Sequence, residues 1–274
     1  MERSAVKNRL CISTVIDQNY ANYIPLFIYT LKTSYPEYHI KLFTYGKFNQ
    51  QVKNALDLIK FDYKIVPGLF NKYAKYKYSP ISWRFIIPPE HYKEYDYVYI
   101  TDIDMMILPE KISLLNFHLN EMSETGLCYS NSKRNAKHWE GHRSLTGLHF
   151  VSQEWFEKTE KARKKYDELL KMGGIGEKRE FDGHMLYLMA KESGLKTPEK
   201  MPLTGRHHGV HLGNWRLFHS YKKLNKRVGV SKCSQWKKIR NTEEFEKIYR
   251  FVSGNPMLRN QIEQLDAHCK RRLG

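Results

Sequence analysis

Two carboxylates, Asp102 and Asp104, follow the apolar residues 97–101, YVYIT. β-Branched and aromatic residues in such a run predict a buried strand that continues to Asp104. In extended backbone, residues two apart point the same way, so the two carboxylates should lie together at its carboxyl end. Their repulsion is costly unless a cation lies between them. This D-x-D pattern predicts a divalent metal that carries a diphosphate; the alternative is a loop cap at Asp102 and a solvated Asp104.

The elements expected around these carboxylates alternate between strands and helices. Apolar and β-branched runs predict strands at residues 10–16, 39–44, 63–66, 127–129 and 148–152, and helical spacing predicts helices at 19–35, 50–59, 154–172 and 181–192. This alternation is typical of a three-layer α/β fold with a mostly parallel central sheet. Such sheets bind ligands at the carboxyl ends of their strands. Asn241 with Glu244 predicts the start of a later helix.

The first expected strand runs into a polar turn, residues 17–23, DQNYANY. A strand, a short turn and a helix form a place where the base and ribose of a nucleotide can lie. An aspartate such as Asp17 can accept from a ribose hydroxyl, and a tyrosine can stack on a base. The sequence holds no G-x-G-x-x-G pattern, so a dinucleotide site is not indicated.

Six segments together resemble glycosyltransferase family 8. Residues 17–23 are similar to the opening of that family, and residues 83–88, WRFIIP, and 95–104, YDYVYITDID, resemble its R-L-x-I-P segment and its Y-L-D-x-D strand. Residues 145–148, LTGL, resemble N-A-G-V; residues 181–186, FDGHML, lie where D-Q-D-x-L is expected; and residues 211–216, HLGNWR, resemble a shortened H-x-x-G-x-x-K-P-W. The segments occur in the family's order over residues 9–218. Gly183 and His184 stand where the family has Gln and a second Asp.

The resemblance implies a GT-A fold and a nucleotide-diphosphate sugar as donor, with a UDP-sugar expected. It also implies Mn²⁺ or Mg²⁺ held by Asp102, Asp104 and a late histidine. Residues 205–213, GRHHGVHLG, hold three imidazoles, of which His211 is the expected ligand and His208 the alternative. Carboxylates with one imidazole suit Mn²⁺.

The resemblance also implies two groups of binding residues. The residues expected to bind the nucleotide sugar are Thr14, Asp17, Asn19, Tyr20, Arg84, Asp102 and Arg216. The residues expected to line the sugar or acceptor pocket are Gly147, His149, Gly183, His184 and Trp215. Two roles are open for the side chain of Arg84: it can pair with Asp102 or bind a phosphate.

Asp182 is the expected catalytic residue. It begins a helix, where a carboxylate is favoured by the helix dipole. It would either take a proton from the acceptor hydroxyl as general base or position donor and acceptor. The alternative is that Asp182 only caps the helix.

The chain is strongly basic. Its 274 residues carry a formal net charge of +17, which indicates an anionic partner. The segment Lys222–Arg240 is rich in cations and lacks acidic residues, so we expect it to contact an anionic membrane bearing a lipid-linked acceptor, with Trp236 inserted at the interface. The alternative functions are RNA binding, suggested by residues 72–78, KYAKYKY, and metal-dependent hydrolysis of nucleotides. Binding of nucleic acid is the less favoured, because no recognised motif for it is present.

Composition and charge predict the organisation of the chain. Residues 1–220 are expected to form the GT-A domain and residues 221–274 a basic helical C-terminal extension. No apolar run approaches the roughly 18 residues of a membrane helix, and residues 1–9 lack an apolar signal region. We therefore expect a cytoplasmic protein, peripheral at the inner face of a membrane. The widely spaced cysteines are expected to be packing residues in a reducing compartment, namely Cys11, Cys128, Cys233 and Cys269.

Overall fold

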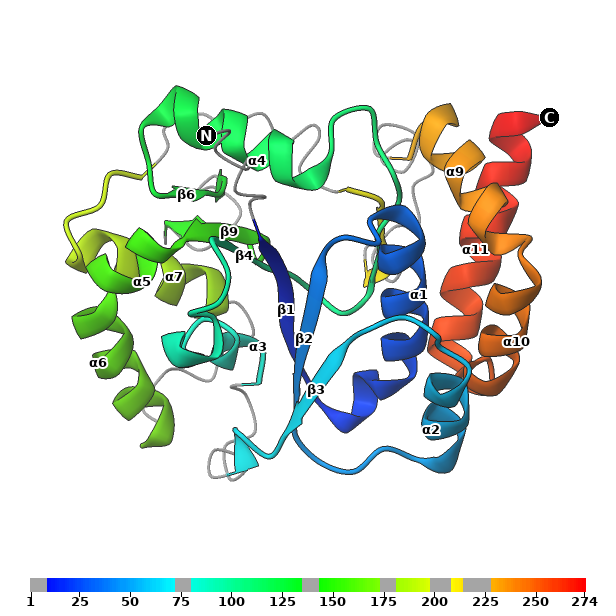
Figure 1. Ribbon diagram of the computed structural model, residues 1–274, viewed down its shortest axis with the longest axis horizontal. Coiled ribbons are helices and arrows are strands. Elements are labelled where there is room, and N and C mark those ends of the chain that lie inside the picture. The colour runs from blue at the N-terminus through cyan, green and yellow to red at the C-terminus, as the bar shows by residue number, and fades with distance from the viewer. Residues whose placement is uncertain (1–8, 72–79, 135–142, 173–180, 198–207, 214–227) are drawn as a thin grey trace, which may run out of the picture.

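The computed structural model describes residues 9–71, 80–134, 143–172, 181–197, 208–213 and 228–274. A central sheet lies between two layers of helices (Figure 1). The sheet has six strands in the order β3-β2-β1-β4-β9-β6. Their bounds are Lys64–Pro67, His39–Thr44, Leu10–Ile16, Tyr97–Ile100, His149–Ser152 and Tyr129–Ser130.

The pairing in the sheet is mostly parallel. β1 pairs in parallel with β2 on one side and with β4 on the other, while β3 continues in parallel from β2. β9 runs antiparallel to both β4 and β6. The order of the strands therefore reverses between β1 and β4, the kind of position where open α/β sheets bind ligands.

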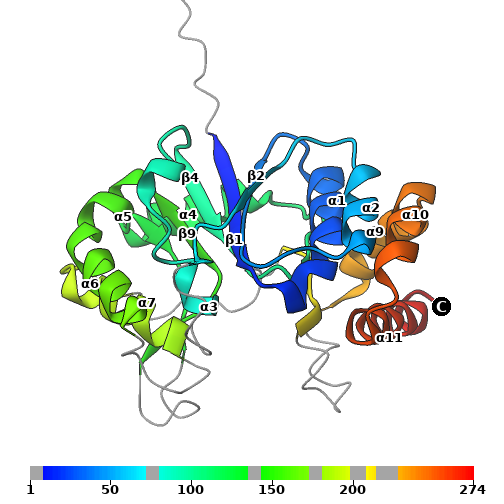
Figure 2. The ribbon, with the colours of Figure 1, turned by 90° about the horizontal axis from the view of Figure 1, so that it is seen from below.

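One face of the sheet is covered by the helices that follow β1 and β2, together with the helices near the C-terminus (Figure 2). They are η1 Gln18–Tyr23, α1 Ile24–Ser34, α2 Gln50–Asp57, α9 Val230–Arg240, α10 Glu243–Val252 and α11 Pro256–Leu273. Ile12 of β1 and Phe245 of α10 belong to the same buried apolar cluster.

The opposite face carries the helices α3 Pro80–Trp83, α5 Gln153–Lys158, α6 Glu160–Lys171 and α7 Phe181–Glu192 (Figure 2). Cys11, Val98 and Val151 point into this second apolar cluster. The sheet is thus buried on both faces, as its β-branched and aromatic composition requires. α4 Leu114–Thr125 packs beside β6, and η3 Pro89–His91 precedes β4.

Short pairs of strands extend from this framework. β5 Met105–Met106 pairs antiparallel with β10 Val210–His211, and β7 Lys133–Arg134 pairs antiparallel with β8 Ser144–Leu145. Both pairs lie outside the main sheet.

The predicted fold class is confirmed: a three-layer α/β architecture with a mostly parallel sheet and C-terminal helices. β1, β2 and α7 have the expected bounds. The expected strand over residues 97–104 ends at Ile100, because the chain turns at Ile103 and Asp104. The late helix is capped by Thr242, whose Oγ1 accepts from Phe245 N–H, rather than by Asn241.

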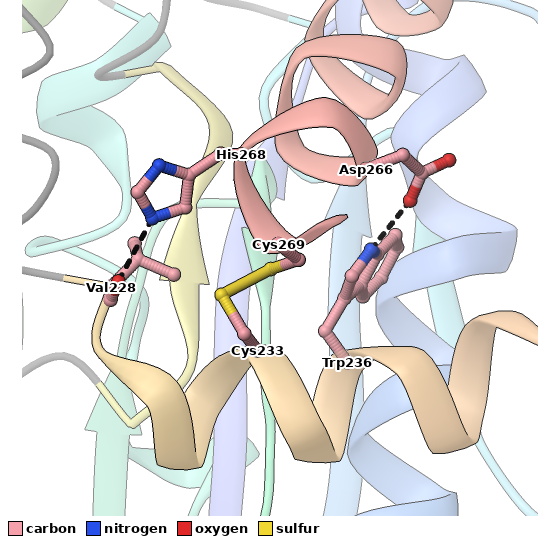
Figure 3. The surroundings of a disulfide bond; sticks show 6 residues. All are labelled: Val228, Cys233, Trp236, Asp266, His268 and Cys269. Atoms are coloured by element: carbon pink, nitrogen blue, oxygen red, sulfur yellow. Dashed lines mark hydrogen bonds between the residues drawn. A yellow bond between two sulfur atoms is a disulfide. The ribbon is translucent and has the colours of Figure 1, made fainter. Parts of the chain in front are cut away.

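The cysteine prediction is wrong for two of the four residues. Cys233 of α9 and Cys269 of α11 form a disulfide (Figure 3), whereas Cys11 and Cys128 are free and buried. Disulfides are typical of oxidising compartments, so the cysteines give no support to a reducing one. Beside the bond, His268 Nε2 lies 2.9 Å from Val228 O.

Trp236 does not reach a membrane interface. Its side chain is buried, and its indole N–H donates to Asp266 Oδ1 at 2.7 Å (Figure 3). The boundary expected at residues 220 and 221 lies outside the described residues, as does the 72–78 segment. Among the helices described, none is both long enough and apolar enough to cross a bilayer.

Candidate active site

Asp102 and Asp104 lie just beyond the end of β4, beside the end of β1. Thr101 N–H donates to Ser13 O at 3.0 Å, which holds the start of the turn against β1. The turn brings Asp104 back toward β5, so its carboxylate is buried while that of Asp102 is half-buried. Both carboxylates therefore face the edge of the sheet where the strand order reverses.

The short ribbon of β5 and β10 brings His211 to this edge. His211 pairs with Met105, and Leu212 N–H donates to Asp104 O at 2.8 Å. As a result, His211 Nε2 lies 3.1 Å from Asp104 Oδ1 and 3.8 Å from Asp102 Oδ2. One ligand atom from each of these three residues lies within 4.8 Å of the others.

This group of side chains fits a divalent cation. Two carboxylates and one imidazole are donors suited to Mn²⁺, and carboxylates also suit Mg²⁺. Space beside them is kept by Gly213, where an added Cβ would come within 2.9 Å of His211 Nε2 and 2.5 Å of an Asp104 oxygen. Any side chain at this position would fill the space next to the ligands.

The imidazole of His211 lies within ion-pair distance of both carboxylates. Burial alone would lower the pKa of His211, but the adjacent carboxylates, Asp104 above all, outweigh it and raise the pKa above the ordinary value. The two carboxylates therefore favour the protonated form of the imidazole. A bound metal ion would take the place of that proton.

Arg84 links the metal group to Asp182. Its buried guanidinium donates to Asp102 through Nη1 and to Asp182 Oδ2 through Nη2, the latter at 2.9 Å. Burial alone would lower the pKa of Arg84, but the two carboxylates raise it. Of the two roles expected for Arg84, the structure shows the pairing with Asp102. It also shows a pairing of Arg84 with Asp182 that sequence reasoning missed.

Two glycines permit this arrangement. An added Cβ at Gly147 would overlap the guanidinium of Arg84, and one at Gly183 would overlap the backbone oxygen of Leu145. Gly147 therefore lets Arg84 reach Asp182, while Gly183 lets α7 approach β8.

The residues expected to bind the nucleotide surround the end of β1. Thr14 is buried within the strand, and the carboxylate of Asp17 caps η1 by accepting from Asn19 N–H at 2.8 Å and Tyr20 N–H at 3.1 Å. Asn19 is exposed and Tyr20 half-buried. Asp17 thus has a structural role whether or not it also contacts a ligand.

The remaining histidines lie in different surroundings. His149 is fully buried against Trp155 and Asn131, and His184 contacts Arg143 O through Nδ1 at 2.8 Å. His208 is buried, and its Nε2 lies 3.2 Å from Ile112 O, so it is not part of the group formed by His211. Trp215 and Arg216 lie outside the described residues.

Asn131 is a residue that sequence reasoning missed. Its Oδ1 accepts from Thr146 N–H at 2.9 Å and from Thr146 Oγ1 at 2.7 Å, and its Nδ2 lies 2.9 Å from His149 Nδ1. These contacts fix the loop that carries Gly147. No motif surrounds Asn131, so only the fold reveals it.

No protein-family profile and no curated protein sequence matches the chain. Several solved structures resemble it. Core-mannan synthase A from Aspergillus fumigatus, in a Mn/GDP form, has a TM-score of 0.47 and 9% identity over 69% of this chain and 71% of its own. The galactosyltransferase LgtC, with donor and acceptor sugar analogues, has a TM-score of 0.42 and 11% identity over 89% of this chain and 95% of its own.

The mannosyltransferase Ktr4p from S. cerevisiae, in complex with GDP, has a TM-score of 0.45 and 13% identity over 89% of this chain and 84% of its own. The three structures are glycosyltransferases. At these TM-scores and identities they do not assign an activity to this chain.

Proposed function

We propose that this chain is a metal-dependent glycosyltransferase. It would move a hexose or a related sugar from a nucleotide-diphosphate donor, with a UDP-sugar expected, to a saccharide or lipid-linked glycan. The observation that carries the proposal is the convergence of Asp102, Asp104 and His211 at the reversal point of the sheet. The similarity of residues 17–23, 83–88 and 95–104 to glycosyltransferase family 8 supports the same assignment.

The chemistry of sugar transfer explains why such a group is needed. As the bond between the sugar and the diphosphate breaks, negative charge grows on the leaving phosphate. A bound Mn²⁺ or Mg²⁺ ion would supply positive charge to that phosphate. Asp102, Asp104 and His211 would hold the ion, and Arg84 orients Asp102 through a hydrogen bond from its Nη1.

Asp182 is proposed as the carboxylate nearest the reacting carbon. Arg84 fixes one of its oxygens, so its position is coupled to that of Asp102. The two roles considered from the sequence remain proposals: a general base in an inverting reaction, or a positioning group in a retaining one. The side chain is largely buried, which suits a residue that must act away from bulk water.

We also propose positions for the donor and the acceptor. We propose that the nucleotide lies over the end of β1, where Thr14, Asp17, Asn19 and Tyr20 are placed. Arg216 is proposed to neutralise phosphate. The sugar and acceptor are proposed to lie on the side of Asp182, near Gly147, His149, Gly183 and His184. Trp215 is proposed to line the same pocket on the family resemblance alone.

The experiment is a panel of nucleotide sugars tested with Mn²⁺, with Mg²⁺ and with a chelator, with separate detection of sugar transfer and of donor hydrolysis. Transfer that requires metal supports the proposal; hydrolysis without transfer to any acceptor would favour the phosphohydrolase alternative. In Asp104→Asn, metal-dependent binding of the nucleotide diphosphate should be lost. The matched control is Asp57→Asn, since Asp57 is an exposed aspartate on α2.

We further propose that the basic segment Lys222–Arg240 contacts an anionic membrane. In its described part, Lys237 and Lys238 are exposed at the end of α9. Each cation near such a surface contributes about 1 kcal/mol. Sedimentation with anionic vesicles but not with neutral ones is expected. Equal binding to both kinds of vesicle, or to neither, would exclude this contact.

A further inference from the structure

The peptide groups of Gly209 are held by an ion pair that lies outside the proposed metal group. Glu110 Oε1 accepts from Gly209 N–H at 3.0 Å, and Lys232 Nζ donates to Gly209 O at 3.1 Å. The two side chains also pair with each other, with 3.0 Å between Lys232 Nζ and Glu110 Oε1. They are 16% and 23% exposed, so solvent screens the pair only in part.

The held residue lies two positions before the proposed ligand His211. Gly209 has φ +110°, a left-handed conformation that favours glycine, and an added Cβ would overlap Met106 O. This backbone is therefore tightly packed where β10 begins. Because β10 has only two residues, the placement of His211 against Asp104 depends on how the chain enters the strand.

The two holding side chains come from distant parts of the chain. Glu110 follows β5, whereas Lys232 belongs to the first turn of α9. α9 is itself fixed on α11, because the residue after Lys232 forms the Cys233–Cys269 disulfide (Figure 3). His268 of α11 also contacts Val228 O, just before α9. Lys232 thus projects from an anchored element.

We propose that Lys232, paired with Glu110, is a positioning residue for His211, and that the C-terminal helices thereby set the affinity of the site for a divalent cation. The inference rests on the proposed metal site. Lys232 acts through the backbone of Gly209, to which it donates a hydrogen bond. Loss of a partner that bonds a metal ligand directly weakens metal binding by about 10- to 100-fold, and we expect the lower end of that range for Lys232, which acts one step farther from His211.

The direction in which cation affinity changes when Lys232 is replaced distinguishes a positioning role from a purely electrostatic one. Lys232 carries a positive charge, so its removal should strengthen the binding of a cation if charge alone matters. If Lys232 positions His211, Lys232→Met should instead weaken binding. The matched control is Lys111→Met, which removes an exposed cation next to Glu110 in the chain.

The experiment measures the affinity of the intact chain for Mn²⁺ alone, by titration of the free-ion EPR signal, with thermal unfolding of the metal-free protein as a check on the fold. Lys232→Met should bind Mn²⁺ about 10-fold more weakly than the parent, Lys232→Arg should recover most of the affinity, and Lys111→Met should not weaken it. In the Glu110→Gln background, Lys232→Met should lower the affinity for Mn²⁺ by a smaller factor than it does in the parent, since the two side chains act together.

Unchanged or tighter binding by Lys232→Met would overturn the positioning role while leaving the proposed metal site intact. Equal weakening by Lys111→Met would do the same, since it would show that the loss of affinity is not specific to the contact of Lys232 with Gly209. If the parent binds no Mn²⁺, the metal site itself is wrong. Weakening in Lys232→Met without recovery in Lys232→Arg would also contradict the proposal.

Discussion

Arg84 Nη2 lies 2.9 Å from Asp182 Oδ2, although the two residues are 98 positions apart in the chain. The same guanidinium contacts Asp102, so a single buried cation joins one proposed metal ligand to the proposed catalytic carboxylate. The positions of Asp102 and Asp182 are therefore coupled through Arg84.

Arg84→Lys tests this link. Lysine keeps the charge, but its single ammonium group cannot donate to both carboxylates in the planar geometry of a guanidinium. We expect turnover to fall by ~100-fold, as misplacement of reacting groups commonly does. Steady-state kinetics measure the effect. Arg250→Lys, at an exposed arginine of α10, serves as the control, and an equal loss in that variant would contradict the prediction.

Asp182→Asn keeps the shape of the side chain and removes its charge. If Asp182 acts on the reacting groups, turnover should fall by ~100-fold or more while donor affinity changes little. Near-normal turnover would show that Asp182 only pairs with Arg84 at the start of α7 and does not act on the reacting groups. Measurement of the anomeric configuration of the product by NMR would decide independently between inversion and retention.

His211 and His208 should respond differently to substitution by alanine. His211→Ala should abolish metal-supported turnover with little change in fold, since its imidazole faces Asp104. His208→Ala should instead lower the free energy of unfolding by about 1–3 kcal/mol, because His208 is buried against Phe117 and Ile112 O. Denaturant unfolding and Mn²⁺ titration separate the two effects. His207→Ala is a further comparison, and it should retain metal-supported turnover.

Metal binding should release a proton. The carboxylates raise the pKa of His211 above its ordinary value of 6.5, so the imidazole of the metal-free protein stays charged up to a higher pH. Metal affinity should therefore rise with pH and level off above the raised pKa. The stabilisation that the charged imidazole gives the metal-free protein is complete below pH 6.5 and is lost as the pH rises through the raised value.

Calorimetry of Mn²⁺ binding in buffers with different ionisation enthalpies measures that proton directly. The number of protons released should decline as the pH rises through the raised value. Release that does not vary with pH would exclude His211 as its source.

Reduction of the disulfide should destabilise the protein. Cys233 and Cys269 are 36 residues apart in the chain. By restricting the unfolded chain, a disulfide that closes a loop of this length contributes about 4 kcal/mol to the free energy of unfolding. Unfolding in denaturant, with and without a phosphine reductant, measures the difference. A Cys233→Ser/Cys269→Ser variant should match the reduced parent and should not respond to the reductant.

The sequence predicted the elements with a regular pattern. The strands at residues 10–16 and 39–44 and the helix at 181–192 followed from local composition and periodicity, which act over a few residues. The convergence of Asp102 and Asp104 was expected from a shared strand direction, yet the strand ends at Ile100 and the carboxylates meet through a turn. The resemblance to a family, rather than the spacing, led to His211.

The contacts that join distant segments could not be predicted in this way. The Arg84–Asp182 pair, the Glu110–Lys232 pair and the disulfide depend on how helices pack on a sheet, which no local pattern encodes. Trp236 shows the same limit. An aromatic residue among cations suggested an interfacial role, but packing of α9 on α11 buries it.

The C-terminal helices share their apolar core with the sheet, so a shortened chain that lacks them would expose part of that core. Phe245 packs edge-on against Tyr29 of α1, and Gln261 of α11 accepts a hydrogen bond from Tyr23 at 2.6 Å. A fragment that stops before α9 would leave these aromatic rings in water and the phenol of Tyr23 without that acceptor. The region after residue 228 is therefore not a dispensable tail: truncation there should yield an aggregating fragment rather than a smaller enzyme.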